Sequence, residues 1–268
     1  MYASVYQLRA DIFERVGRGQ HLLLYGPRGS GKSRLVTQLH DRFLRSNIPC
    51  AIAPSTACLD DITRALHNAY PDVDIDAVNR RTARYRLRSA ADRRRCVLLL
   101  DHLSKVSTAM VGFLRQLRGG IAGVLFVVDV DVERERMRMR KRAKSLALSV
   151  RMPLAPVAQL RALLHATCAE RGRALELEDE QLLLRAARGR PGWIVLCTAL
   201  MSAAPYWHEG HLYARLLCTD TEISLRQGGL RLLAPEGWSA ASGRPWTSPL
   251  TDYDEEGFWT RMRRAPTR

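Results

Sequence analysis

The stretch that most limits how this chain can fold is residues 26–33, Gly-Pro-Arg-Gly-Ser-Gly-Lys-Ser. It fits the pattern G-x-x-x-x-G-K-[ST] at every fixed position. Glycines at these places let the backbone curl until several N–H groups point at one phosphate chain. An apolar run at 21–25 precedes the loop, and apolar residues spaced three and four apart follow it through 33–47. The pattern predicts a buried strand, a phosphate-binding loop and a helix whose positive N-terminal end faces the phosphates.

The side chains of this loop have separate expected roles. Lys32 can reach the β- and γ-phosphates of ATP, and the hydroxyl of Ser33 can bind Mg²⁺. The residues expected around the nucleotide are Gly26, Pro27, Arg28, Gly29, Ser30, Gly31, Lys32 and Ser33. A chance glycine-rich turn is the competing interpretation, and the strand and helix expected on either side argue against it.

A second apolar run, at 96–100, ends in Asp101. A carboxylate at the tip of a buried strand beside the phosphate loop can hold Mg²⁺, directly or through water. An ordinary turn acid is the alternative interpretation. The next residue is His102, where a glutamate that positions water is common. A neutral imidazole can accept a proton or orient water, so His102 is a candidate catalytic residue beside Lys32 and Asp101.

A third apolar run, at 121–128, ends in Asp129. A polar side chain at this strand end can lie near the γ-phosphate or the attacking water, which makes Asp129 a further catalytic candidate. A turn acid without ligand contact fits Asp129 equally well.

Basic residues are concentrated in two segments of a chain whose formal net charge is +15. Residues 77–95 hold eight arginines against one aspartate, and residues 133–144 hold seven basic residues against two glutamates. Such clusters indicate a polyanion partner, and we expect nucleic-acid backbone contacts from a helix over the first segment. The candidate contact residues are Arg80, Arg81, Arg84 and Arg88. A general bias towards arginine on solvated faces is the alternative, because only four of the 42 basic residues are lysines.

The composition argues against several other classes of protein. An apolar fraction of 46% is ample for a core. We find no apolar run long enough to span a membrane, and charged residues within the first 16 positions argue against a signal peptide there. The six cysteines form no C-x-x-C pair, which favours buried free thiols in a reducing cytosol. We therefore expect a cytoplasmic protein that does not contact membranes.

Strand and helix patterns alternate up to Met152, and helical patterns follow it through residue 202. This order implies an α/β fold of the P-loop NTPase type, in which a parallel sheet has helices on both faces and a small helical lid follows. The expected domains are the nucleotide-binding domain at 1–153, the lid at 154–205 and a partly irregular C-terminal extension at 206–268. Residues 223–232 fit either a hairpin around Gly228-Gly229 or a helix that ends at Gly228.

This order of features resembles the AAA+ ATPases: a P-loop, an acid-tipped strand, a strand ending in a polar residue and then a helical lid. Residues 150–156 resemble the passage from the last strand to the lid in that family. Residues 187–194, Ala-Arg-Gly-Arg-Pro-Gly-Trp-Ile, resemble the G-x-P start of a lid helix in the branch that includes origin-recognition, transposition-helper and signalling switch ATPases. The resemblance covers about residues 5–203.

Three positions depart from the family pattern. His102 replaces the usual glutamate, and Asp129 replaces the usual asparagine, serine or threonine. The lid arginine that the family often places after the proline is Gly192 here, which leaves Arg190 as the candidate nucleotide contact.

The resemblance also implies rings or filaments, in which an arginine of a neighbouring subunit completes the site by neutralising charge on the γ-phosphate. The candidates for this arginine finger are Arg134, Arg136, Arg138, Arg140 and Arg142. The same arginines can instead bind DNA phosphates or face water.

The resemblance implies an ATPase, slow or stimulated by a partner, whose ATP- and Mg²⁺-bound state controls homo-oligomerisation and nucleic-acid binding. Recombination, transposition and replication are the settings that the family suggests. The replacement at His102 supports an alternative, a slow or non-hydrolysing switch that acts on a protein partner. A small-molecule kinase is a further alternative, and the helical domain after the sheet argues against it.

Overall fold

The structure is a computed structural model that describes residues 4–54, 58–75, 78–103, 108–117, 119–129, 147–208 and 210–227. These residues divide into two compact units. The first unit holds residues 4–27 and 32–153, and the second holds residues 28–31 and 154–227. The basic segment 133–144 and the predicted turn at Gly228-Gly229 lie outside the described residues.

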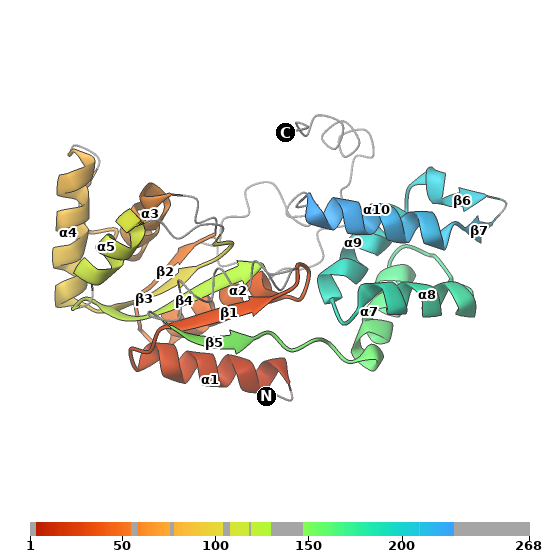
Figure 1. Cartoon of the computed structure of the whole chain (residues 1–268), viewed down its shortest axis with the longest axis horizontal. Coiled ribbons are helices and arrows are strands. Elements are labelled where there is room, and N and C mark those ends of the chain that lie inside the picture. The colour runs from red at the N-terminus through yellow and green to blue at the C-terminus, as the bar shows by residue number, and fades with distance from the viewer. Residues whose placement is uncertain are drawn as a thin grey trace. The chain divides into compact units, whose positions relative to one another are not determined.

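The first unit is built on a five-stranded parallel sheet (Figure 1). In spatial order the strands are β2 (Cys50–Ala53), β3 (Cys96–Leu100), β4 (Ile121–Asp129), β1 (Leu22–Gly26) and β5 (Leu148–Arg151). The three central strands are almost entirely buried, which explains why they read as continuous apolar runs. The predicted α/β fold with a parallel sheet is confirmed.

Helices cover both faces of this sheet, and alternate residues of β3 show the two layers. Val97 and Leu99 belong to the core formed with α1 (Val5–Gly17) and α2 (Lys32–Arg45). Cys96, Leu98 and Leu100 belong to the opposite core. That core is formed with α3 (Leu59–Ala69), α4 (Arg80–Arg93) and α5 (Thr108–Gln116). Successive side chains of a strand point to opposite faces, so one apolar strand supplies both cores.

The basic helix predicted over 77–95 is shorter in the structure. It begins after Asn79, whose side chain accepts a hydrogen bond from the N–H of Thr82 at 2.9 Å. This N-cap satisfies one of the amide groups that the first turn of a helix leaves without a partner. At its other end the helix stops at Arg93, so Arg94 and Arg95 lie beyond it.

The second unit is helical apart from one short hairpin (Figure 1). Its helices are α7 (Val157–Ala169), α8 (Leu177–Ala187), α9 (Pro191–Met201) and α10 (Ala214–Arg226). A 3₁₀ turn (Ala204–Tyr206) leads into antiparallel β6 (Trp207–His208) and β7 (His211–Leu212). Seven of the eleven residues of α9 are buried, which makes it the central helix of this unit.

Helix α10 decides between a hairpin strand and a helix for residues 223–226. Leu217 and Leu225 lie on the buried side of one helix, so the helical interpretation is right and a strand at Ile223–Leu225 is wrong. This helix, which the sequence placed in a C-terminal extension, belongs to the same core as α7, α8 and α9.

Four of the six free cysteines are buried, as predicted, whereas Cys218 is half-buried and Cys58 is exposed. Among the described residues, no helix combines the length and the apolar character needed to cross a membrane.

Candidate functional site

The predicted phosphate loop lies between β1 and α2. Its backbone is left-handed at Gly29 (φ = +77°) and at Gly31 (φ = +93°), a conformation that residues with a Cβ rarely adopt. Strand β1 ends at Gly26, and α2 begins at Lys32. The loop therefore has the strand–turn–helix setting that a phosphate-binding loop requires.

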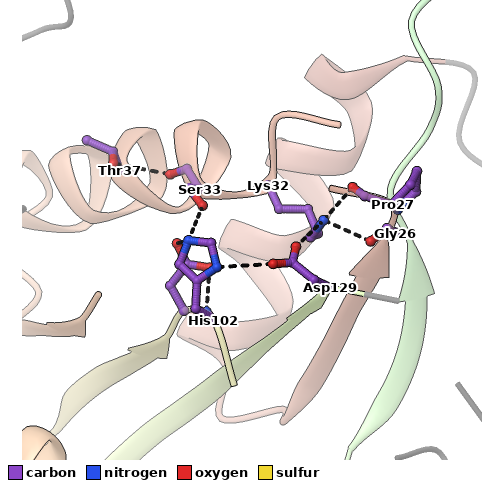
Figure 2. A network of polar contacts seen from close by, with 8 residues as sticks. Gly26, Pro27, Lys32, Ser33, Thr37, His102 and Asp129 are labelled. Atoms are coloured by element: carbon purple, nitrogen blue, oxygen red, sulfur yellow. Dashed lines mark hydrogen bonds and ion pairs between the residues drawn. The ribbon is translucent and has the colours of Figure 1, made fainter. Parts of the chain in front are cut away.

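The ammonium group of Lys32 is buried and faces three oxygen acceptors (Figure 2). Its Nζ donates to the carbonyl oxygens of Gly26 at 2.8 Å and Pro27 at 2.7 Å. The same Nζ lies 2.9 Å from Oδ1 of Asp129. Asp129 thus forms an ion pair with the lysine that was expected to hold phosphates.

His102 connects Asp129 to the start of α2 (Figure 2). Its Nδ1 lies 3.2 Å from Oδ2 of Asp129, and its Nε2 lies 3.2 Å from Oγ of Ser33. An ionised carboxylate only accepts hydrogen bonds, so Nδ1 carries a proton. In the neutral imidazole, Nε2 is then an acceptor, and it competes with the Asp101 carboxyl for the one proton of the Ser33 hydroxyl.

The backbone of His102 also has a special conformation. Its φ is +48°, in the left-handed region, and its N–H donates to Oδ1 of Asp101 at 2.8 Å. Histidine enters this region more readily than most side chains. The turn directs the imidazole back towards α2, where Nε2 also lies 3.7 Å from Oδ2 of Asp101.

The two carboxyl groups beside His102 have pKa values shifted in opposite directions. Burial raises the pKa of Asp101, although the charge that His102 carries when protonated and hydrogen bonds from Ser33 and from the His102 amide lower it in part. Burial also acts to raise the pKa of Asp129. Hydrogen bonds from His102 and Lys32, together with the charge of Lys32 and that of a protonated His102, outweigh burial and hold the pKa of Asp129 well below its usual range. Asp129 is therefore ionised at neutral pH.

The order of the strands brings these residues together. Strand β4 lies between β1 and β3, and Gly26 is paired in register with Asp129. Asp101 directly follows β3. The carboxyl ends of parallel strands lie at the same edge of a sheet. The ends of β1, β3 and β4, with Gly26, Asp101 and Asp129, are therefore neighbours there. The sequence predicted each strand end separately, but only the sheet order places Asp129 against Lys32.

The site offers oxygen ligands of the kind that Mg²⁺ prefers. The Ser33 hydroxyl is hydrogen-bonded to the Asp101 carboxyl, so two hard oxygen donors lie side by side at the start of α2. A divalent cation there would favour the charged form of Asp101, against the effect of burial. Ser33 and Asp101 thus fit the metal-binding role predicted for them.

Arg190, the predicted lid contact, is held inside the second unit. Its Nη2 lies 2.8 Å from Oε2 of Glu222, and its Nε and Nη2 donate to the carbonyls of Ala187 and Ala186. The side chain is buried at the start of α9. These contacts give Arg190 a structural role, and its contact with nucleotide stays a prediction.

The four candidate arginines of α4 differ in their ion pairs and in the exposed fraction of their side chains. Arg80 and Arg84 both pair with Asp60, at 3.1 and 2.8 Å, and Nε of Arg84 also donates to Thr63. Arg84 is only 28% exposed, so it joins α4 to α3. Arg80 is 82% and Arg88 46% exposed, and Arg81 is exposed as well.

The five arginine-finger candidates, Arg134, Arg136, Arg138, Arg140 and Arg142, lie outside the described residues.

Comparison with known proteins now identifies the family. The family described as AAA ATPase domain matches residues 3–196. The chain belongs to this family of AAA+ P-loop ATPases. Nucleotide binding is a shared property of this family, and residues 26–33 of this chain keep the full loop pattern. No curated protein matches the sequence.

Solved structures with a similar fold include a Walker-type ATPase of Pyrococcus abyssi, at a TM-score of 0.55 and 13% identity. That alignment covers 87% of this chain and 75% of the other. The ORC1 protein of Aeropyrum pernix, solved in complex with DNA, matches at a TM-score of 0.55 and 14% identity. It covers 85% of this chain and 66% of the ORC1 chain. At these identities the likeness concerns the fold.

Proposed function

We propose that this AAA ATPase domain hydrolyses ATP with Mg²⁺, slowly or under the control of a partner, and that its nucleotide state controls self-association and binding to nucleic acid. The observation that carries the proposal is the meeting of Lys32, Ser33, Asp101 and His102 at the carboxyl ends of β1 and β3. The metal-binding and proton-accepting groups are thereby within hydrogen-bonding reach of one another, and Asp129 links His102 to the phosphate-binding Lys32.

Each group has a defined task in this proposal. Lys32 and the amide groups of the loop bind the phosphates, which places the γ-phosphate beside the start of α2. Ser33 and Asp101 hold Mg²⁺, which neutralises charge on the phosphate oxygens.

His102 is the proposed proton acceptor. With Nδ1 protonated towards Asp129, Nε2 presents a lone pair that can take a proton from the attacking water. The Asp129 carboxylate keeps the ring oriented and stabilises the imidazolium that forms, as a buried acid does for a catalytic histidine. If Ser33 held Mg²⁺, its hydroxyl would no longer donate to Nε2, and Nε2 would be left to accept from water.

The exposed arginines of α4 support contact with nucleic-acid backbone. Arg81 and Arg88 are the best candidates, because Arg84 is committed to Asp60 and Thr63. Such phosphate contacts are sequence-independent and weaken as salt concentration rises. Self-association through an arginine within 134–142 belongs to the same proposal, as does a nucleotide-binding domain at 1–153 followed by a lid that begins at residue 154.

A second candidate function is an ATP-dependent switch that acts on a protein partner with little or no hydrolysis. Two observations favour it: His102 stands where the related ATPases carry glutamate, and Asp129 ties that imidazole into a hydrogen-bonded network with Lys32. A base held in this way binds water only after the network rearranges.

The deciding experiment measures ATP turnover with and without double-stranded DNA, at low and moderate salt, with Lys32→Ala as the control. We expect turnover that DNA stimulates, that salt reduces and that the control lacks. Tight ATP binding without turnover in any condition would contradict hydrolysis and favour the switch. Turnover that is identical with and without DNA would contradict the nucleic-acid role.

A further inference from the structure

We infer that Asp129 is an internal counter-ion that competes with the nucleotide for Lys32 and so weakens nucleotide binding, while its second oxygen positions His102. The inference rests on the proposed nucleotide site and concerns a role at that site which lies outside the sensing of γ-phosphate or water. It follows from the contacts of three side chains, Lys32, Asp129 and His102 (Figure 2).

The first step of the argument is the set of acceptors around Lys32. An ammonium group carries three N–H donors. Three oxygens lie within 2.9 Å of Nζ: the carbonyls of Gly26 and Pro27 and Oδ1 of Asp129. Of these three acceptors only the Asp129 carboxylate has a net negative charge, so its Oδ1 faces Lys32 as a phosphate oxygen would. For the ammonium to donate to phosphate, at least one of the three contacts has to lengthen or open, and the ion pair with Asp129 is the one that the charge of the phosphate opposes.

The second step is electrostatic. Lys32 is 4% exposed and Asp129 is 20% exposed, so water screens this pair poorly. A triphosphate held by Lys32 would bring several negative charges close to a carboxylate of the same sign. The carboxylate therefore opposes nucleotide twice, by occupying the lysine and by repelling the phosphates.

The third step concerns the two oxygens of Asp129, which have different partners. Oδ1 faces Lys32, and Oδ2 faces Nδ1 of His102 at 3.2 Å. An asparagine at this position keeps one carbonyl oxygen that can accept from His102, but it loses the charge that pairs with Lys32. An alanine loses both. The two substitutions thus separate the counter-ion role from the positioning role.

The test measures the dissociation constant of a non-hydrolysable ATP analogue with Mg²⁺, by calorimetry at fixed salt, for wild type, Asp129→Asn and Asp129→Ala. We expect both variants to bind at least about tenfold more tightly than wild type, because each removes the competing charge. Asp92→Asn is the matched control: it removes the same charge from α4, where Asp92 pairs loosely with Arg88 at 3.9 Å, and should change binding less than about twofold. Unchanged or weaker binding in the Asp129 variants would overturn the inference.

A second readout is the melting temperature, measured without and with the analogue. Without ligand, Asp129→Ala should melt at a lower temperature than wild type, because Lys32 and His102 lose their shared acceptor. The rise in melting temperature on adding the analogue should be larger in the variant than in wild type. A variant with the melting temperature of wild type in the absence of nucleotide would overturn the proposed ion pair itself.

Turnover separates the positioning role. Asp129→Asn should keep a larger share of kcat than Asp129→Ala, because its amide oxygen can still accept from Nδ1 of His102. Tighter analogue binding with a lower kcat in Asp129→Ala is the combination that the inference requires. If wild type binds the analogue through Lys32 and the Asp129 variants bind it no more tightly, the inference is rejected. The proposed nucleotide site is not affected by that result. Absence of binding in every variant would reject both.

Discussion

The Nε2 atom of His102 lies 3.2 Å from the hydroxyl oxygen of Ser33, the residue that we expect to bind Mg²⁺. In the proposed site, this contact puts an imidazole nitrogen next to the expected metal position, where it would take a proton from the attacking water. Asp129 fixes the ring from the other side, at 3.2 Å from Nδ1. In the proposed mechanism, His102 takes the role that a glutamate has in the related ATPases.

Replacing His102 with asparagine should therefore reduce ATP turnover by about 10²- to 10⁴-fold, the usual contribution of a general base, while ATP binding changes little. Asparagine is the substitution of choice, because residue 102 has φ = +48° and asparagine tolerates this region better than alanine does. Steady-state turnover and calorimetric binding are the measurements. Full turnover in His102→Asn would show that the imidazole takes no part in catalysis.

Removing exposed arginines from α4 should weaken DNA binding without unfolding the domain. For Arg81→Gln with Arg88→Gln, we expect the slope of log K against log salt to fall by about two, because each arginine that neutralises a phosphate adds roughly one to the slope. Fluorescence anisotropy with labelled duplex at several salt concentrations measures this slope. Arg185→Gln is the control, because Arg185 is an exposed arginine of α8 that donates to Gln181. An unchanged slope in the double variant would mean that Arg81 and Arg88 face solvent and do not contact DNA phosphates.

The pair between Arg190 and Glu222 predicts a pH-dependent contribution to stability. A hydrogen bond from Arg190 lowers the pKa of Glu222, against burial and with help from the charges of Arg190 and Arg226. Its folded pKa is below the unfolded value of about 4.3, so the stabilisation is present above that value and disappears as pH falls through the folded pKa.

Glu222→Gln should accordingly lower the free energy of unfolding at pH 7 by about 1–2 kcal/mol, since Arg190 is buried and loses its charged partner. The difference from wild type should shrink as pH falls from 5 towards 3. Urea denaturation at pH 7, 5 and 3.5 measures both effects, with the exposed Glu178→Gln as control. A difference that stays constant over this range would contradict the assignment to the Glu222 charge.

Two glycines of the first unit should respond in opposite ways to alanine. A Cβ on Gly123 of β4 would lie 2.2 Å from the Val16 carbonyl oxygen and 2.8 Å from that of Gln20. We expect Gly123→Ala to destabilise the fold by more than about 2 kcal/mol, because both contacts are with backbone. On α5, a Cβ on Gly112 would meet nothing within 4 Å, so Gly112→Ala should stabilise by about 0.5–1 kcal/mol. Thermal denaturation of the two variants tests the pair, and similar changes in both would contradict it.

The sequence was sufficient for the local features of the nucleotide site. The loop pattern, the apolar run before it and the helical spacing after it depend on neighbours within a few residues, and the structure has β1, the loop and α2 in those places. The acid-tipped strands were recognisable for the same reason, since a buried strand in a parallel sheet is a continuous apolar run.

Helix α10 was the harder case for sequence analysis. Two of its buried positions, Thr221 and Ser224, are polar and interrupt the apolar pattern. Thr221 satisfies its hydroxyl by donating to the carbonyl of Leu217 at 2.6 Å, so it can be buried without cost to hydrogen bonding. For Arg84 the sequence suggested a nucleic-acid contact, which stays a prediction, and only the structure shows its ion pair with Asp60 in α3.

By itself the sequence determined the phosphate loop, the parallel α/β fold and the residues that end the strands, because short-range patterns of apolar residues and glycines encode them. The tertiary structure alone decided which strand ends meet. Asp129 is 97 residues from Lys32 along the chain, and their 2.9 Å contact exists because β4 pairs with β1 in one register. Backbone hydrogen bonds between strands set that neighbour relation, and they carry no signature in the local sequence.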